Sequence, residues 1–111
     1  MKSGNIFDNI PKASAEEIFE SIFECETLRF ERIVSSGQSS PDGFWYDQPQ
    51  DEWVMLLSGK AVLRFEQEAE PVSLNPGDYL LIPAHTKHRV ESTDRSQQTV
   101  WLALHFNFPL I

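Results

Sequence analysis

Hydrophobic positions follow a helical period in one segment near the start of the chain, residues 14–24. Apolar side chains recur there at helical spacing, at Ile18, Phe19, Ile22 and Phe23. Ser14 is followed three residues later by Glu17, which fits a capping box, and acidic residues suit the first turn of a helix. The pattern predicts a short α-helix over about residues 14–24, with its apolar stripe packed on the rest of the domain.

After this segment the period shortens to that of extended strands. Apolar runs alternate with turn-forming residues about every ten positions, in "TLRFERIVSSG", "EWVMLLSG", "KAVLRFE", "VSLNPGDYLLIP", "KHRVES" and "TVWLALHFNF". Ser58-Gly59-Lys60 predicts a hairpin between the second and third runs, and Pro76-Gly77 predicts a turn. Many short strands with regular turns indicate an all-β barrel or sandwich. We predict an N-terminal extension, residues 1–26, and a β-barrel domain, residues 27–111.

Composition narrows the classes of partner and compartment. The 111 residues suit one domain, and 9 Lys and Arg against 17 Asp and Glu give a net charge of -8. A basic patch is what nucleic acids and anionic membranes attract, so we predict neither as a partner. No apolar run approaches the length of a membrane span, and the first residues lack the apolar core of a secretory signal. These features predict a cytoplasmic protein.

The lone cysteine, Cys25, excludes an intramolecular disulfide. It is flanked by Glu24 and Glu26, and neighbouring negative charge raises the pKa of a thiol. A nucleophilic role for Cys25 is therefore not expected.

Two residues stand out as candidates for chemistry. His88 begins a short strand after a turn and alternates with Val90, so that both side chains share a face. Glu52 opens the run "EWVMLL" in alternation with Val54 and Leu56. A carboxylate on a core-facing side is costly unless it is paired or coordinated. The alternatives are a satisfied core histidine and a solvated strand-end glutamate.

The spacing of these residues resembles the two motifs of the cupin family, roughly G-x5-H-x-H-x3,4-E-x6-G and G-x5-P-x-G-x2-H-x3-N. Glu52, six residues and Gly59 match the end of the first motif. Gly77, five residues, Pro83 and then His88 match the second. The motifs and the strands between them cover residues 43–92. The resemblance implies an antiparallel cupin β-barrel, or jelly roll, which here carries the short N-terminal helix.

The resemblance also implies a site, although the first motif is degenerate. His88 and Glu52 fall on family metal ligands, whereas both first-motif histidines are absent. Their places are taken by Tyr46 and Gln48 with a three-residue gap, or by Trp45 and Asp47 with a four-residue gap, and we favour the first pair. A divalent metal such as Mn, Fe or Zn held by Tyr46, Gln48, Glu52 and His88 is one alternative. The other is a pocket in which the same groups bind a small ligand without metal. No organic cofactor is expected.

Two further histidines complete the candidates. His85 replaces the glycine of the second motif, and the asparagine is replaced by Ser92. His85 and Glu52 are the candidates for proton transfer. His105 alternates with Trp101 and Ala103, and the pattern leaves open whether this face lines the barrel.

These features support three hypotheses about function. The first is a metal-dependent isomerase, lyase or dioxygenase that acts on a small oxygen-rich molecule. The second is a non-catalytic cupin that binds or senses a small molecule, and the third is a structural module. Apolar residues on both faces of "WVMLL" and "TVWLALHF" exceed what one barrel interior needs, so we also predict a homodimer.

Overall fold

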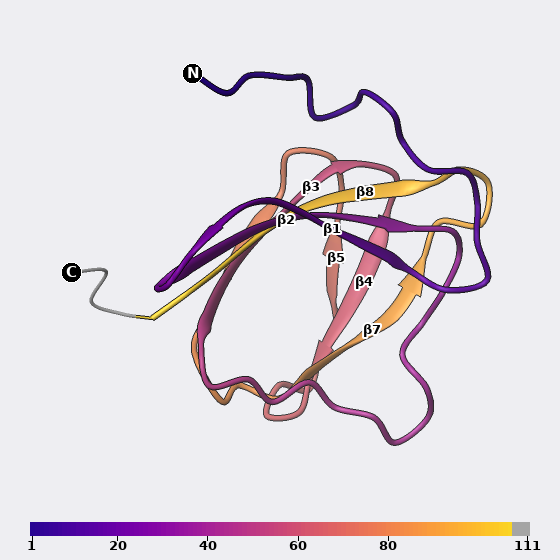
Figure 1. Cartoon of the computed structure of the whole chain (residues 1–111). Helices are drawn as coiled ribbons and strands as arrows, with labels where there is room; N and C mark the ends of the chain where they lie inside the picture. The colour runs from indigo at the N-terminus through magenta and orange to yellow at the C-terminus, as the bar shows by residue number, and fades with distance from the viewer. Residues whose placement is uncertain (108–111) are drawn as a thin grey trace.

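The computed structural model describes residues 1–107 and is built of strands, with no helix among those residues (Figure 1). The strands in chain order are β1 (Ile18–Cys25), β2 (Leu28–Ser35), β3 (Asp51–Ser58), β4 (Ala61–Phe65), β5 (Val72–Leu74), β6 (Tyr79–Ile82), β7 (His88–Thr93) and β8 (Thr99–Phe106). Residues 108–111, which close the predicted barrel domain and the last predicted strand, lie outside the described residues. The described part of the chain contains no helix long and apolar enough to cross a membrane.

The strands form two antiparallel sheets, which confirms the predicted all-β barrel. One sheet has five strands in the order β1-β2-β8-β3-β6, and the other has three in the order β5-β4-β7. Side chains from the inner faces of both sheets meet in a buried cluster that includes Val54, Leu56, Leu63, Leu74 and Trp101. Buried and less buried residues alternate along β3 and β8, because every second side chain of each strand points into the barrel.

The predicted helix over residues 14–24 is wrong, because Ile18–Cys25 forms strand β1. The strand pairs antiparallel with β2 along its length, with an irregularity between Ser21 and Phe23. Isoleucine and phenylalanine also favour strands, so pairing with β2 overrides the helical spacing. The Ser14 hydroxyl accepts a hydrogen bond from the Glu16 amide at 3.4 Å, which makes a local turn where a helix cap was expected.

The predicted hairpin at Ser58-Gly59-Lys60 is also wrong. β3 lies in the five-stranded sheet and β4 lies in the three-stranded sheet, so the chain crosses between sheets at this turn. The turn around Gly77 makes a second crossing, from β5 back to β6. Both glycines have positive φ, 86° at Gly59 and 94° at Gly77. A third crossing, between β6 and β7, places β7 on the wall of the barrel opposite β3, with their inner faces toward each other.

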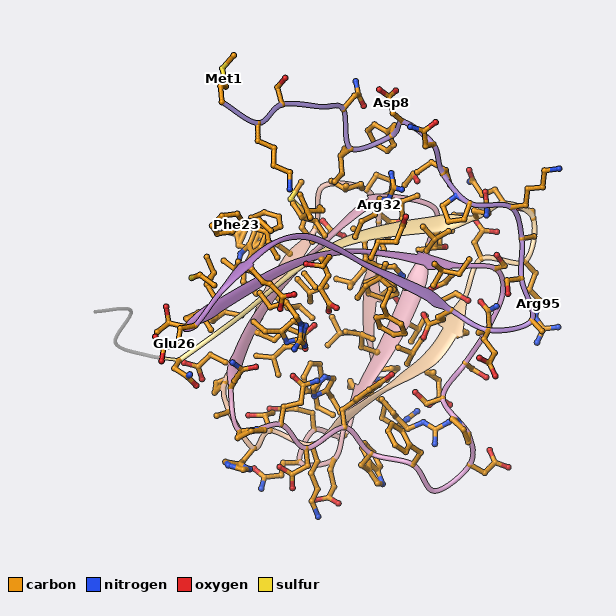
Figure 2. All side chains as sticks on the ribbon, in the orientation of Figure 1. Met1, Asp8, Phe23, Glu26, Arg32 and Arg95 are labelled. Atoms are coloured by element: carbon orange, nitrogen blue, oxygen red, sulfur yellow. The ribbon has the colours of Figure 1, made fainter. Side chains whose placement is uncertain are left out.

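The N-terminal segment lies across the outer face of the five-stranded sheet, above β1 and β2 (Figure 1). Arg32 of β2 points outward beneath this segment, which also carries Asp8 (Figure 2). The Arg32 guanidinium donates hydrogen bonds to three backbone carbonyls, those of Ile6 at 2.9 Å, Asp8 at 2.7 Å and Asn9 at 3.2 Å. Arg32 also forms an ion pair with Glu20 of β1, in which Nη2 lies 2.8 Å from Oε1. Charge and backbone hydrogen bonds therefore fix the N-terminal segment to the barrel.

Candidate active-site cavity

A cavity of about 200 Å³ opens between the two sheets. Its apolar walls come from strands of both sheets and include Ile33, Val54, Leu63, Ile82, Val90 and Trp101. Its polar lining consists of Glu17, Arg29, Glu31, Tyr46, Gln48, Glu52, His88 and His105. Mostly apolar walls with a few convergent polar groups are typical of small-molecule sites.

The first pair of titratable side chains in the cavity is His88 and Glu52. His88 begins β7 and Glu52 follows the first residue of β3, so each side chain points inward from one wall. The two residues are only 6% and 8% exposed, and His88 Nε2 lies 3.6 Å from Glu52 Oε1. His88 Nδ1 lies 2.8 Å from the Thr86 carbonyl oxygen. A carbonyl only accepts, so Nδ1 carries a hydrogen and Nε2 faces Glu52.

Opposing influences act on the pKa of His88. Burial alone would lower the pKa, because it disfavours the imidazolium. Hydrogen bonds to Glu52 and to the Thr86 carbonyl, together with the negative charge of Glu52, outweigh burial and raise the pKa above its usual value. The negative charge of Glu52 therefore favours the protonated form of the buried His88 imidazole, which faces the cavity.

Tyr46 supports His88 from the loop before β3. The two backbones exchange hydrogen bonds, with 2.7 Å from the Tyr46 amide to the His88 carbonyl and 3.1 Å in the other direction. Their rings stack with centroids 5.5 Å apart. Burial, followed by the charges of Glu17 and Glu52, raises the pKa of Tyr46 above its usual value, which keeps the phenol protonated.

A second histidine–carboxylate pair lies on the neighbouring strands. His105 of β8 is the cross-strand partner of Glu52, is 5% exposed and lines the cavity, which settles the side on which it faces. Its Nε2 lies 3.0 Å from Oε1 of Glu31, and the other oxygen of Glu31 lies 3.4 Å from Arg29 Nε. Among residues 1–107, His105 Nδ1 and Arg29 Nε are buried nitrogens without a hydrogen-bond partner. Such atoms carry a desolvation cost that a bound oxygen atom would remove.

Glu17 is the third carboxyl group of the cavity, and sequence reasoning missed it because Glu17 was assigned to the first turn of a helix. It lies next to β1 and its Oε2 accepts a hydrogen bond from the Ser35 hydroxyl. Burial raises the pKa of Glu17, and the Ser35 hydrogen bond only partly opposes this. A strand alternation that pairs Glu17 with Phe19 is the signal that could have revealed it, since both line the cavity.

The structure separates the predicted site residues into two groups. Tyr46, Gln48, Glu52 and His88 all line the cavity, whereas Trp45 and Asp47 do not. His85 does not line the cavity either. Its side chain is 67% exposed, its φ is 59°, and Nδ1 lies 2.8 Å from Asp47 Oδ1. No structural observation places His85 within reach of a ligand bound beside His88.

The histidine and acidic side chains of the cavity are not by themselves grouped as a metal centre, so a metal ion would also need oxygen ligands from Tyr46 or Gln48. Within residues 1–107, no three His, Cys, Asp or Glu side chains are grouped so that they could hold one. Glu52 and His88 contact each other, and the nearby His105 is engaged by Glu31 through Nε2. Metal centres of this type need three or more nitrogen, sulfur or oxygen ligands from the protein. Proton transfer and hydrogen bonding are what these side chains can perform themselves.

The cupin-domain sequence pattern matches residues 31–105, and the chain belongs to the cupin family. A crystal structure from Ralstonia eutropha JMP134, described as a "putative mannose-6-phosphate isomerase", is 50% identical with a TM-score of 0.93, over 96% of this chain and 99% of that one. A cupin superfamily protein from Desulfitobacterium hafniense DCB-2 is 18% identical with a TM-score of 0.73, over 88% and 84%. The polyketide cyclase RemF from Streptomyces resistomycificus is 16% identical with a TM-score of 0.75, over 96% and 79%. The last two show the shared fold alone. No curated protein matches the chain.

Proposed function

We propose that the cavity binds a small hydroxylated carbonyl compound and that His88 and Glu52 move protons on it, as in an aldose–ketose isomerase. The observation that carries this proposal is the buried His88–Glu52 pair, whose Nε2 and Oε1 lie 3.6 Å apart in the cavity. A buried histidine with a raised pKa beside a carboxyl group in a cleft is typical of acid–base catalysts. The relative described as a "putative mannose-6-phosphate isomerase" makes sugars and sugar phosphates the first substrates to examine.

The two groups have complementary roles in such a reaction. The Glu52 carboxylate removes the proton from the carbon next to the substrate carbonyl, and His88 Nε2–H gives its proton to the carbonyl oxygen. The resulting enediol has no net charge change, because one proton has left carbon and one has joined oxygen. Glu52 then gives its proton to the former carbonyl carbon. His88 Nε2 takes a proton from the hydroxyl group on the carbon that Glu52 first deprotonated. The Thr86 carbonyl holds the imidazole in the required tautomer throughout.

The test is exchange and interconversion of D-mannose 6-phosphate and D-fructose 6-phosphate, with D-mannose and D-fructose as phosphate-free partners. Proton NMR in D₂O would follow both product formation and deuterium incorporation at the exchanging carbon. Parallel samples would contain a chelator or added Mn²⁺, Fe²⁺ or Zn²⁺, because the family resemblance implies a metal. Glu52→Gln and His88→Gln should each lower the rate by about 10²- to 10⁴-fold, the range that one acid or base contributes.

Two other variants give the comparison. Glu68→Gln changes an exposed glutamate outside the cavity and should leave the rate unchanged. His85→Gln tests the candidate that the sequence suggested, and a loss there with full activity in His88→Gln would overturn the assignment. Binding of a sugar without exchange or turnover under any of these conditions would instead support the non-catalytic alternative.

A further inference from the structure

We infer that Glu17, which lies outside the matched cupin segment, is a specificity-determining residue of the cavity that hydrogen-bonds a hydroxyl group of the bound molecule. This inference deepens the proposed function and rests on it only for the presence of a hydroxylated ligand. Glu17 precedes residues 31–105, so the match to the family does not include it. The segment that carries it nevertheless supplies part of the cavity wall.

The Glu17 carboxyl group is held in place by a chain of two hydrogen bonds. The Trp101 indole Nε1–H donates to Ser35 Oγ at 2.9 Å, and the Ser35 hydroxyl donates to Glu17 Oε2. An indole N–H can only donate, so the single hydroxyl hydrogen of Ser35 remains for Glu17. Ser35 is fully buried and Trp101 is 4% exposed, which makes the support rigid. The chain uses one carboxyl oxygen and leaves the other for a molecule in the cavity.

Charge distinguishes Glu17 from the other two carboxyl groups of the cavity. Glu52 is paired with His88, and Glu31 is paired with His105 and Arg29. Among residues 1–107, no Lys, Arg or His side chain lies within ion-pair distance of Glu17. A partly buried carboxyl group without a cation opposes folding, and burial accordingly raises its pKa. A group retained at such a cost inside a cavity is a candidate for ligand contact.

The neighbourhood of Glu17 selects a hydroxyl group over an anion. Glu17, Glu52 and Tyr46 all line the cavity, and the charges of both carboxyl groups act on Tyr46. A phosphate or carboxylate there would meet like charges, whereas a hydroxyl can donate to a carboxylate or accept from a phenol. In either protonation state, the free oxygen of Glu17 can hydrogen-bond a hydroxyl.

Arg29 lies level with Glu52 in the five-stranded sheet, because His105 is the cross-strand partner of both residues. Arg29 is on the same inner edge of β2 as Ser35, roughly 20 Å away along the strand at about 3.3 Å per residue. It is the arginine of the cavity lining, and its buried Nε has no hydrogen-bond partner among the described residues. Arg29 is already paired with Glu31, so the inference for Glu17 concerns a hydroxyl group and assigns no place to an anionic group.

The experiment measures binding of D-mannose and of its monodeoxy analogues by calorimetry, in the wild type and in Glu17→Gln. The amide can still accept the Ser35 hydrogen bond but replaces the carboxyl oxygen that faces the ligand. We expect D-mannose to bind about 10- to 100-fold more weakly, the range for a hydrogen bond to a charged group. For the one analogue that lacks the contacted hydroxyl, the same substitution should change affinity less than about 2-fold, which a purely structural role of Glu17 would not produce.

Controls separate folding from binding. Glu16→Gln changes the neighbouring exposed residue and should leave all affinities unchanged. The melting temperature of Glu17→Gln at neutral pH should match or exceed that of the wild type, because the amide has no charge to bury. Glu17→Asp keeps the carboxyl group but shortens the side chain by one methylene, and it should weaken the binding of D-mannose as well.

The outcomes also separate this inference from the proposed function. If Glu17→Gln binds D-mannose and all analogues as the wild type does while His88→Gln abolishes turnover, the inference fails and the proposed function stands. If the sugars bind in a Glu17-dependent manner without exchange or turnover, the inference stands and the proposed function fails. If none of the sugars binds the wild type, both are overturned.

Discussion

Replacing Gly59 by alanine should destabilise the barrel far more than the same change at Gly77, although both glycines have positive φ. Each glycine sits where the chain crosses between the two sheets. A side chain built on Gly59 would place Cβ 2.4 Å from Thr99 Oγ1 and 2.7 Å from Thr99 Cα. At Gly77 no heavy atom comes within 4 Å of such a Cβ. The pair therefore separates the conformational cost of alanine from the cost of steric overlap.

The magnitude follows from these two contributions. An L-residue forced to positive φ costs about 1–2 kcal/mol, and both substitutions bear this cost. Gly59→Ala adds overlap with a backbone atom of β8, which cannot rotate away, and overpacking of this kind costs about 1–3 kcal/mol or more. We expect a loss of about 2–5 kcal/mol in the free energy of unfolding for Gly59→Ala and about 1–2 kcal/mol for Gly77→Ala.

Urea denaturation followed by tryptophan fluorescence measures both losses under one set of conditions. Thr99→Ala in the Gly59→Ala background should recover only part of the loss, because it removes Oγ1 but leaves Cα in place. Equal losses at the two glycines would refute the steric argument. Full recovery by Thr99→Ala would show that the flexible hydroxyl, and not the backbone, determines the cost.

Two further predictions concern pH and assembly. The pKa of His88 is raised in the folded protein, so its contribution to stability is fully present below about pH 6.5 and is lost as pH rises through the folded value. The difference in unfolding free energy between the wild type and His88→Gln should therefore be larger at pH 6 than at pH 9, and a difference that grows with pH would contradict the sign. We also expect a homodimer through the outer face of the five-stranded sheet, where Tyr79 and Leu81 of β6 are 62% and 61% exposed. Light scattering should give twice the chain mass of 12.8 kDa for the wild type and a monomer for Leu81→Lys, and a monomeric wild type would contradict this expectation.

The strands of the barrel could be predicted from the sequence because burial on one face imposes alternation. β1 could not, because Ile18, Phe19, Ile22 and Phe23 satisfy a helical stripe as well as a strand edge. The choice between the two is made by pairing with β2, a contact between segments whose register no local pattern contains. The hairpin prediction at Gly59 was wrong for the same reason. The sequence shows the glycine, but it does not show the sheet to which each flanking strand belongs.

The residues of the candidate site also differ in whether local spacing or long-range pairing determines their positions. Glu52 and His88 could be located because each sits at a set distance from a glycine and from the strand that it opens, so short-range spacing is sufficient. Whether His105 faced inward depended on its pairing with β3. Glu17 depended on the path of a segment that had been assigned to a helix. Residues near a motif could thus be predicted, whereas residues brought to the cavity by long-range pairing could not.

The N-terminal segment connects these observations, because it serves both faces of the five-stranded sheet. On the outer face, its backbone carbonyls accept hydrogen bonds from the buried Arg32 guanidinium. On the inner face, its continuation places Glu17 against Ser35 and into the cavity. A change that loosens the segment from Arg32 would therefore also displace a group that we assign to the ligand. Because β1 joins both contacts as an edge strand, part of the cavity wall depends on a segment that the family's two motifs do not include.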